Sequence, residues 1–176
     1  IKLRRPLSET QEQLTEKLMR EVSDPKYRAV SFKLCEVLAT MPFSAASDIF
    51  DLMEEDFAAL GKKTRSSFSE LRIKAEAAAL KKYEIKVRVS LGKIYDILAK
   101  TAGLPAEEKP ALMERECSLI EKYAVPRECV RQLFRKAKST NKRVIIAAET
   151  IYPADTVRAV IENCGYTSCD GLVYVP

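Results

Sequence analysis

A strand–helix–strand pattern at the C-terminal end of the sequence constrains the fold most. The run "KRVIIAAET" (142–150) is apolar in its centre and bounded by polar residues, as in a strand buried on both faces of a sheet. In "PADTVRAVIENCG" (153–165), Pro153 can begin a helix and Gly165 can end it. The stretch "DGLVYVP" (170–176) predicts a further strand. Such crossovers are almost always right-handed and join parallel strands, so we predict an α/β fold.

Another strand is predicted near the N-terminus, and the long interval that follows it is helical. Segment 27–35 is rich in Val, Phe and Leu, and it follows a helix predicted for 8–22. Apolar residues then recur at helical spacing as far as residue 138. Five helices are predicted there, over 47–60, 66–83, 90–102, 107–123 and 126–138.

Together these elements predict a partial Rossmann-like sheet of three parallel strands, with a large helical cap inserted after strand one. We expect residues 1–43 and 139–176 to form the core and residues 44–138 to form the cap. With so few strands, one edge of strand one would lie open. An open edge invites association. We therefore expect the N-terminal helix, a protein partner, a second copy or further residues of a longer chain to cover it.

Composition narrows the functions that the chain can perform. Its 176 residues are 47% hydrophobic and 31% charged, with 30 basic and 25 acidic side chains spread along the chain. No basic run is concentrated enough to predict nucleic-acid binding, and no apolar run predicts membrane insertion. Histidine is absent, which excludes histidine acid–base chemistry, and none of the five cysteines forms a CxxC pair. Scattered thiols of this kind predict a reduced, cytoplasmic protein.

The ends of the predicted strands are the expected place for a ligand. In an open parallel sheet, ligands bind at the carboxyl ends of the strands. "KLCEV" (33–37) follows the first strand and "AAETIYP" (147–153) follows the second, so these two segments should face each other. The helical insertion would lie above them as a lid.

Several segments, taken in order, resemble one known family. They are "VSFKLCEVLATMPF", "DIFDLMEEDF", "LRIKAEAAA", "KIYDILAK" and "NKRVIIAAETIYPADTVRAVIENCGY". This layout, over about 27–175, is similar to the haloacid-dehalogenase-like hydrolases. More narrowly, it resembles a bacterial subgroup whose first motif reads like VSFDIFDTLL and which is often found beside glycosyltransferase modules in surface-polysaccharide proteins. The resemblance implies a bacterial protein associated with polysaccharide biosynthesis.

The positions that carry catalysis in this family are altered in this chain. The resemblance places the nucleophilic aspartate at Lys33, a second acid at Cys35, a threonine at Val37, and a phosphate-binding Ser or Thr at Ala148. The sequence stops at Pro176, before the family's basic third motif and its acidic metal-binding fourth motif, so we expect an incomplete core. The resemblance therefore implies a pseudoenzyme with degenerate motifs.

Elementary chemistry points the same way. Phosphoryl transfer through an aspartyl intermediate needs a carboxylate nucleophile and Mg²⁺ to neutralise developing charge. The ammonium of Lys33 cannot attack as a carboxylate and would repel the metal. We therefore predict no catalytic residue and no cofactor, with Mg²⁺ required only if the chain is an enzyme after all.

The polar residues near the two strand ends remain candidates for ligand binding. Lys33 either pairs with Glu36 or Glu149, or binds a phosphate or carboxylate. Glu36 and Glu149, together with Asp155, are weak candidates for a metal site, and Thr150 is a candidate ligand contact.

Cys35 beside Lys33 could be an activated thiolate, but a buried, inert cysteine is the alternative that we favour.

Three functions are compatible with the sequence. The leading one is a degenerate hydrolase-like domain that acts as a binding or scaffold module and takes a phosphorylated or sugar ligand. The second is a divergent phosphatase or phosphotransferase that uses non-standard acids. The third is an interaction module that works through the helical cap.

Overall fold

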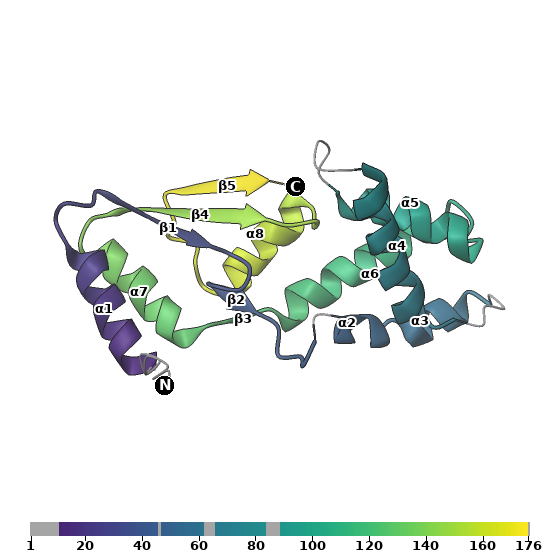
Figure 1. Ribbon diagram of the computed structural model, residues 1–176, viewed down its shortest axis with the longest axis horizontal. Helices are drawn as coiled ribbons and strands as arrows, with labels where there is room; N and C mark the ends of the chain where they lie inside the picture. Colours follow the sequence, from purple (N-terminus) through teal and green to yellow (C-terminus); the bar gives the residue numbers. More distant parts are fainter. Residues whose placement is uncertain (1–10, 46, 62–65, 84–88, 176) are drawn as a thin grey trace, which may run out of the picture.

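The computed structural model describes residues 11–45, 47–61, 66–83 and 89–175, and it has two regions, each with its own apolar cluster. The first region is a small sheet with helices, and the second is entirely helical (Figure 1). The helical region is inserted between the first strand of the sheet and the second, as the sequence predicts.

Within the described residues the sheet contains three parallel strands, which confirms the predicted fold class. They are β1 (Ala29–Lys33), β4 (Arg143–Glu149) and β5 (Gly171–Val175), in the order β1-β4-β5. The register pairs Lys33 with Ala147 and Ala148 with Tyr174. Burial alternates along the central strand β4: Val144, Ile146 and Ala148 are buried, and the residues between them are not.

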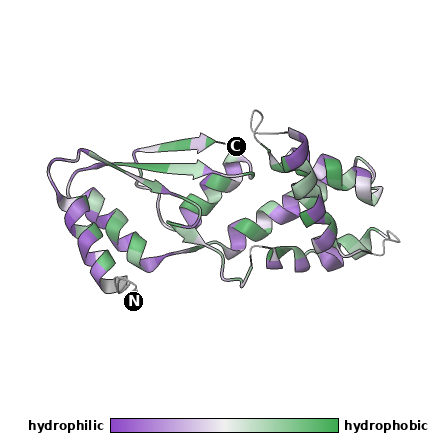
Figure 2. Cartoon of the chain, in the orientation of Figure 1, coloured by the Kyte–Doolittle hydropathy of each residue, from purple (hydrophilic) through white to green (hydrophobic). Residues whose placement is uncertain are grey.

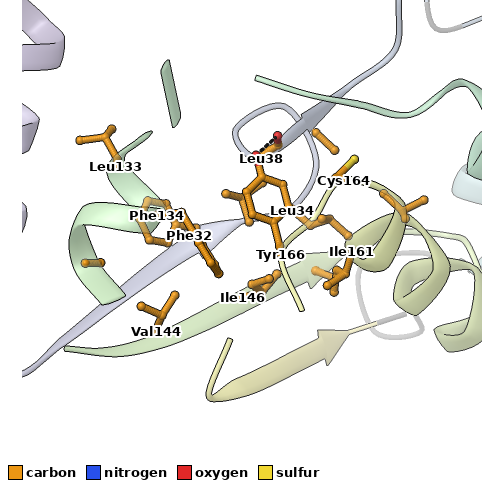
Figure 3. Close-up of a cluster of buried hydrophobic side chains, with 14 of the residues drawn as sticks. Phe32, Leu34, Leu38, Leu133, Phe134, Val144, Ile146, Ile161, Cys164 and Tyr166 are labelled. Carbon is orange, nitrogen blue, oxygen red and sulfur yellow. Dashed lines mark hydrogen bonds between the residues drawn. The ribbon is translucent and has the colours of Figure 1, made fainter. Parts of the chain in front are cut away.

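Three of the described helices pack beside one face of this sheet: α1 (Gln11–Ser23), α7 (Glu128–Ser139) and α8 (Ala154–Asn163). Leu133 and Phe134 of α7 join the same apolar cluster as Ile146 (Figure 3). Tyr166 lies in this cluster too, and its hydroxyl donates a hydrogen bond of 3.0 Å to the carbonyl of Leu38. Helix α7 therefore packs with the sheet, although it lies within the range 44–138 that we expected to form the cap.

The opposite face of the sheet is covered by no helix within the described part of the chain (Figure 1). Val173, on this face of β5, is 52% exposed. Lys33, at the end of β1, is also exposed. Strand β1 is an edge strand that pairs only with β4 among the described strands, and α1 packs against α7. Parallel sheets are usually covered on both faces, so the described residues leave an unusually accessible sheet.

The helical region, in the part of it that the structure describes, has five helices that enclose a second core. They are α2 (Asp48–Asp51), α3 (Glu54–Ala59), α4 (Phe68–Tyr83), α5 (Leu91–Ala102) and α6 (Glu108–Tyr123). The single helix predicted over 47–60 is wrong in one respect, because it is broken into α2 and α3 at Leu52 and Met53. The break leaves Met53 fully buried and Leu52 40% exposed.

Two short connections join the helical region to the sheet, and they pair with each other. Strand β2 (Ala39–Thr40) lies on the outgoing connection and β3 (Val125–Pro126) on the returning one, in antiparallel register. The N–H of Arg127 also donates a hydrogen bond of 3.0 Å to the carbonyl of Leu38. The rings of Phe43 and Tyr123 pack 5.3 Å apart. The apolar pattern of the sequence does not predict this ribbon, and it places Pro126 in a helix.

Figure 2 shows hydrophobic colour along β4, whereas α1 and α7 carry hydrophilic and hydrophobic residues together. This distribution is that of surface helices with one face turned to a core. None of the helices in the described ranges has the length and the apolar character that crossing a membrane requires.

Candidate functional site

The chain turns sharply after β1, and this turn builds one wall of the candidate site. The N–H of Leu34 still bonds to the carbonyl of Ala147, at 2.8 Å. Leu38 and Ala39 then bond back to the carbonyls of Lys33 and Leu34, at 3.1 and 2.9 Å. The turn requires a positive φ of 68° at Glu36. Left-handed backbone is unfavourable for glutamate, so the turn holds Glu36 in a strained conformation.

A depression of about 330 Å³ lies at the carboxyl ends of the three strands. We name it the strand-end depression, and it is lined by Lys33, Cys35, Glu36, Ala147, Ala148, Glu149, Val173 and Val175. It brings together three of the candidate ligand-binding residues from the sequence, namely Lys33, Glu36 and Glu149. The site lies where the C-terminal ends of parallel strands meet.

Lys33 presents its charge to this depression. Its side chain is exposed, and it forms no ion pair with another residue of the described ranges. The salt bridge from Lys33 to Glu36 or Glu149 that the sequence suggests is therefore not present among the described residues. An ammonium and a carboxylate instead line one depression side by side, which offers a ligand both hydrogen-bond donors and acceptors.

The surroundings of Cys35 disfavour its thiolate form. Although the residue is exposed, desolvation raises the pKa of its thiol, and the carboxylate of Glu36 raises it further. A hydrogen bond with Thr150 opposes both effects without reversing them. Thiolate is the reactive form, so this environment suppresses reactivity at neutral pH.

The remaining candidates lie in different places. Ala148 is 1% exposed and belongs to the sheet's apolar cluster. Val37 is half-buried in the turn after β1. Asp155 is on the first turn of α8, where its carboxylate is exposed and pairs with Arg158 at 3.0 Å, and it does not line the strand-end depression.

Thr150 lies on a second pocket, described below. Among the described residues, no group of three or more His, Cys, Asp or Glu side chains is placed to hold a metal ion.

A second pocket, of about 380 Å³, adjoins the first, and sequence reasoning missed it. We name it the junction pocket, because residues of the sheet region, of both connections and of α6 line it. Leu34, Phe43, Ile120, Ala124 and Val160 give it an apolar wall. Cys35 and Glu36 line both pockets, so they separate the two. Its residues come from three separated stretches of the sequence, 34–45, 120–127 and 150–160, and no local pattern marks them.

The loop after β4 links the site to the cap. The hydroxyl of Tyr152 donates a hydrogen bond of 3.2 Å to the carboxylate of Glu116 in α6. The neighbouring carbonyl of Ile151 accepts a bond of 2.8 Å from the N–H of Leu91, at the start of α5. On the sheet side, the hydroxyl of Tyr174 donates to the carbonyl of Tyr152 at 2.9 Å. This loop therefore holds the strand ends and the helical region together.

Comparison with known proteins identifies the fold class. No family model matches the sequence, and no curated protein matches it. Among known structures, a protein from Thermotoga maritima, provisionally described as a β-phosphoglucomutase, superposes with a TM-score of 0.57. The two are 15% identical over 84% of this chain and 61% of that one.

A hydrolase from Streptococcus pneumoniae TIGR4 is also 15% identical, over 85% of this chain and 67% of that one, with a TM-score of 0.39. That score is too low to support an argument.

The chain thus shares the α/β fold of the Thermotoga maritima protein. At 15% identity, the likeness to the Thermotoga maritima protein shows the fold alone. This chain spans about three fifths of that protein's length. Any chemistry of this chain therefore depends on its own residues at the strand ends.

Proposed function

We propose that this chain is a catalytically degenerate, haloacid-dehalogenase-like module that binds a ligand at the strand-end depression without turning it over. One observation carries the proposal: an exposed ammonium, that of Lys33, occupies the end of β1 where the fold's chemistry would begin. Ala148, at the end of β4, offers no hydroxyl and is buried in the core. Lys33 therefore cannot accept a phosphoryl group as a carboxylate nucleophile does, and Ala148 cannot hold one with a hydroxyl.

The charges at the depression favour a sugar or a sugar phosphate as the ligand. The ammonium of Lys33 can hold a phosphate, and the exposed carboxylate of Glu36 can accept hydrogen bonds from sugar hydroxyls. The sequence resemblance supports a setting in a larger bacterial protein of polysaccharide biosynthesis. A protein partner or a second copy along the open edge of β1 would suit that scaffold role.

A phosphatase assay separates this proposal from the alternative of a divergent enzyme. The protein is incubated with an aryl phosphate and Mg²⁺, and beryllium fluoride serves as a mimic of the aspartyl phosphate. We expect no turnover and no stabilisation by the mimic. Turnover that disappears in Glu149→Gln would refute the proposal, because it would show a working acid at the strand ends.

Ligand binding is tested with a panel of sugars and sugar phosphates, by saturation-transfer NMR. Lys33→Gln should weaken the binding of sugar phosphates and leave the binding of neutral sugars largely unchanged. Lys138→Gln is a matched control, because Lys138 is remote from the depression and pairs with Asp170. If no member of the panel binds, a ligand of this class is excluded.

The cap offers a second candidate function, as an interaction surface. Ile73 and Leu80 are 46% and 58% exposed and lie seven residues apart on α4, so they share one face of the helix. Such a stripe is a feature of helix-mediated contacts. Concentration-dependent association that Ile73→Lys abolishes would support this function.

A further inference from the structure

The junction pocket lies where the chain passes between the two regions. The outgoing connection contributes Met41 and Phe43 to its lining, and the returning connection contributes Ala124 and Arg127. The paired strands β2 and β3 hold these two connections together. A molecule in the pocket would therefore contact both connections at once, as well as Val160 of α8.

The chemistry of the lining is mainly apolar. The volume of the junction pocket, about 380 Å³, lies within the ~300–1,000 Å³ range of small-molecule sites. Aliphatic and aromatic side chains form most of the wall, and the neutral polar groups are those of Cys35, Thr40, Thr150, Tyr152 and Thr156. An apolar body of a ligand would be desolvated here, which is the usual source of affinity in such pockets.

The two charged residues of the lining belong to different ends of the pocket. Glu36 is shared with the strand-end depression, whereas Arg127 lines only the junction pocket. The side chain of Arg127 is exposed and forms no ion pair with any residue in the described ranges. Glu36 would repel an anionic group at its own end. A ligand with one negative group would therefore place that group beside Arg127.

We propose that the junction pocket binds an amphiphilic carboxylate, with its hydrocarbon body against Phe43, Ile120 and Val160 and its carboxylate on the guanidinium of Arg127. Arginine matches carboxylates with two parallel hydrogen bonds, which gives both strength and orientation. Because this ligand bridges both connections, its binding stabilises the packing of the sheet region against the cap. The site is distinct from the strand-end depression and does not depend on the function proposed for it.

The test uses decanoate, below its micellar concentration, and decanol as an uncharged analogue of the same length. Binding is measured by calorimetry and by the shift in unfolding temperature. We expect saturable binding of decanoate, with a rise in unfolding temperature. Arg127→Gln should weaken the binding of decanoate about tenfold, which is the loss expected for a hydrogen bond to a charged group. The affinity for decanol should stay unchanged.

Three further variants keep the outcome interpretable. Ala124→Leu places a larger side chain in the pocket and should abolish the binding of both compounds. If this variant misfolds, Ala45→Leu can replace it, because Ala45 lies at an exposed rim position and a larger side chain there should also block binding. Arg158→Gln, at a solvent-exposed pair on α8, should change nothing. The proposal is overturned if decanoate does not bind, if Arg127→Gln binds it equally well, or if filling the pocket has no effect. The phosphatase and sugar-binding assays are independent of these results.

Discussion

The guanidinium of Arg72 donates two hydrogen bonds, each of 2.9 Å, to the carboxylate of Glu116, and both side chains are fully buried in the helical region. The hydroxyl of Tyr95 donates a third bond to the same carboxylate, at 2.8 Å, and Tyr152 donates a fourth at 3.2 Å. Arg72 also pairs with Glu76 at 2.8 Å. Desolvation opposes the charge on Arg72, but its two carboxylate partners outweigh that effect and raise its pKa. The charge of the pair is thus held inside the protein by a nearly complete set of partners.

We predict that Glu116→Gln strongly destabilises the protein. The substitution removes the charge that compensates Arg72, and breaking a buried pair in this way costs about 3–5 kcal/mol. Chemical denaturation, followed by circular dichroism, measures the change in the free energy of unfolding. Arg115→Gln is the matched control, because Arg115 pairs with Asp56 at the surface and such pairs contribute about 0–1 kcal/mol.

The double variant Arg72→Met with Glu116→Leu distinguishes a loss of charge compensation from a loss of packing. It removes both charges, so it should be less destabilised than the sum of its single changes. Strictly additive effects would show that the two side chains do not stabilise each other, contrary to the geometry.

A second prediction concerns the link between the site loop and the cap. Tyr152→Phe removes one hydrogen bond to a charged carboxylate and keeps the ring, so it should lower the free energy of unfolding by about 1–3 kcal/mol. Amide hydrogen exchange should rise most at Leu91, whose N–H bonds to the carbonyl next to Tyr152. Tyr27→Phe, at a 44% exposed position, should leave both quantities unchanged. Unaltered exchange at Leu91 in Tyr152→Phe would indicate that this hydrogen bond does not hold the cap.

Periodicity was sufficient to predict most of the secondary structure, because the pattern of apolar residues is local. The strand–helix–strand unit at the C-terminus and the three-stranded parallel sheet were both predicted. The ribbon of Ala39–Thr40 with Val125–Pro126 was not, since two-residue strands have no period and their pairing joins distant segments. Arg72 has the pattern of a solvated helix face, and only the tertiary packing shows that it is buried.

The strand-end depression could be predicted in part, because its residues follow strands that the sequence indicates. Lys33, Glu36 and Glu149 follow strands, and strand topology alone places them together. Asp155 and Thr150 follow the same strand, but the start of α8 and the loop before it turn them toward other surroundings. The junction pocket depends on how the two regions pack, which no segment of the sequence specifies by itself.

A third prediction tests the strained turn. Glycine adopts the positive φ of Glu36 without steric cost, so Glu36→Gly should leave stability unchanged or raise it by up to about 1 kcal/mol. Glu36→Val should instead lower stability, because a β-branched side chain fits this conformation poorly. Glu55→Gly is the control in helix α3, where the same exchange should cost about 1 kcal/mol. Denaturation midpoints compare the three variants, and a loss in Glu36→Gly as large as that in Glu55→Gly would argue against strain at the turn.

The last prediction concerns alkaline pH. Burial raises the pKa of Tyr166 to about 12, above the value of about 10 for an exposed tyrosine. A group whose pKa is raised on folding contributes stability that is complete below its unfolded pKa and is lost as the pH rises through its folded pKa. Ionisation of Tyr166 should therefore lower the free energy of unfolding between about pH 10 and pH 12.

Tyr166→Phe removes this titration. At neutral pH the free energy of unfolding of the variant should be lower by only about 1 kcal/mol. The reason is that the carbonyl of Leu38 loses the hydrogen bond from the tyrosine hydroxyl but keeps the one from the N–H of Arg127. Above pH 10 its free energy of unfolding should fall less steeply than that of the native protein, so the two curves converge. Denaturation measured in steps from pH 7 to the alkaline limit gives both curves. Parallel curves would show that the hydroxyl of Tyr166 does not titrate differently in the folded and unfolded states.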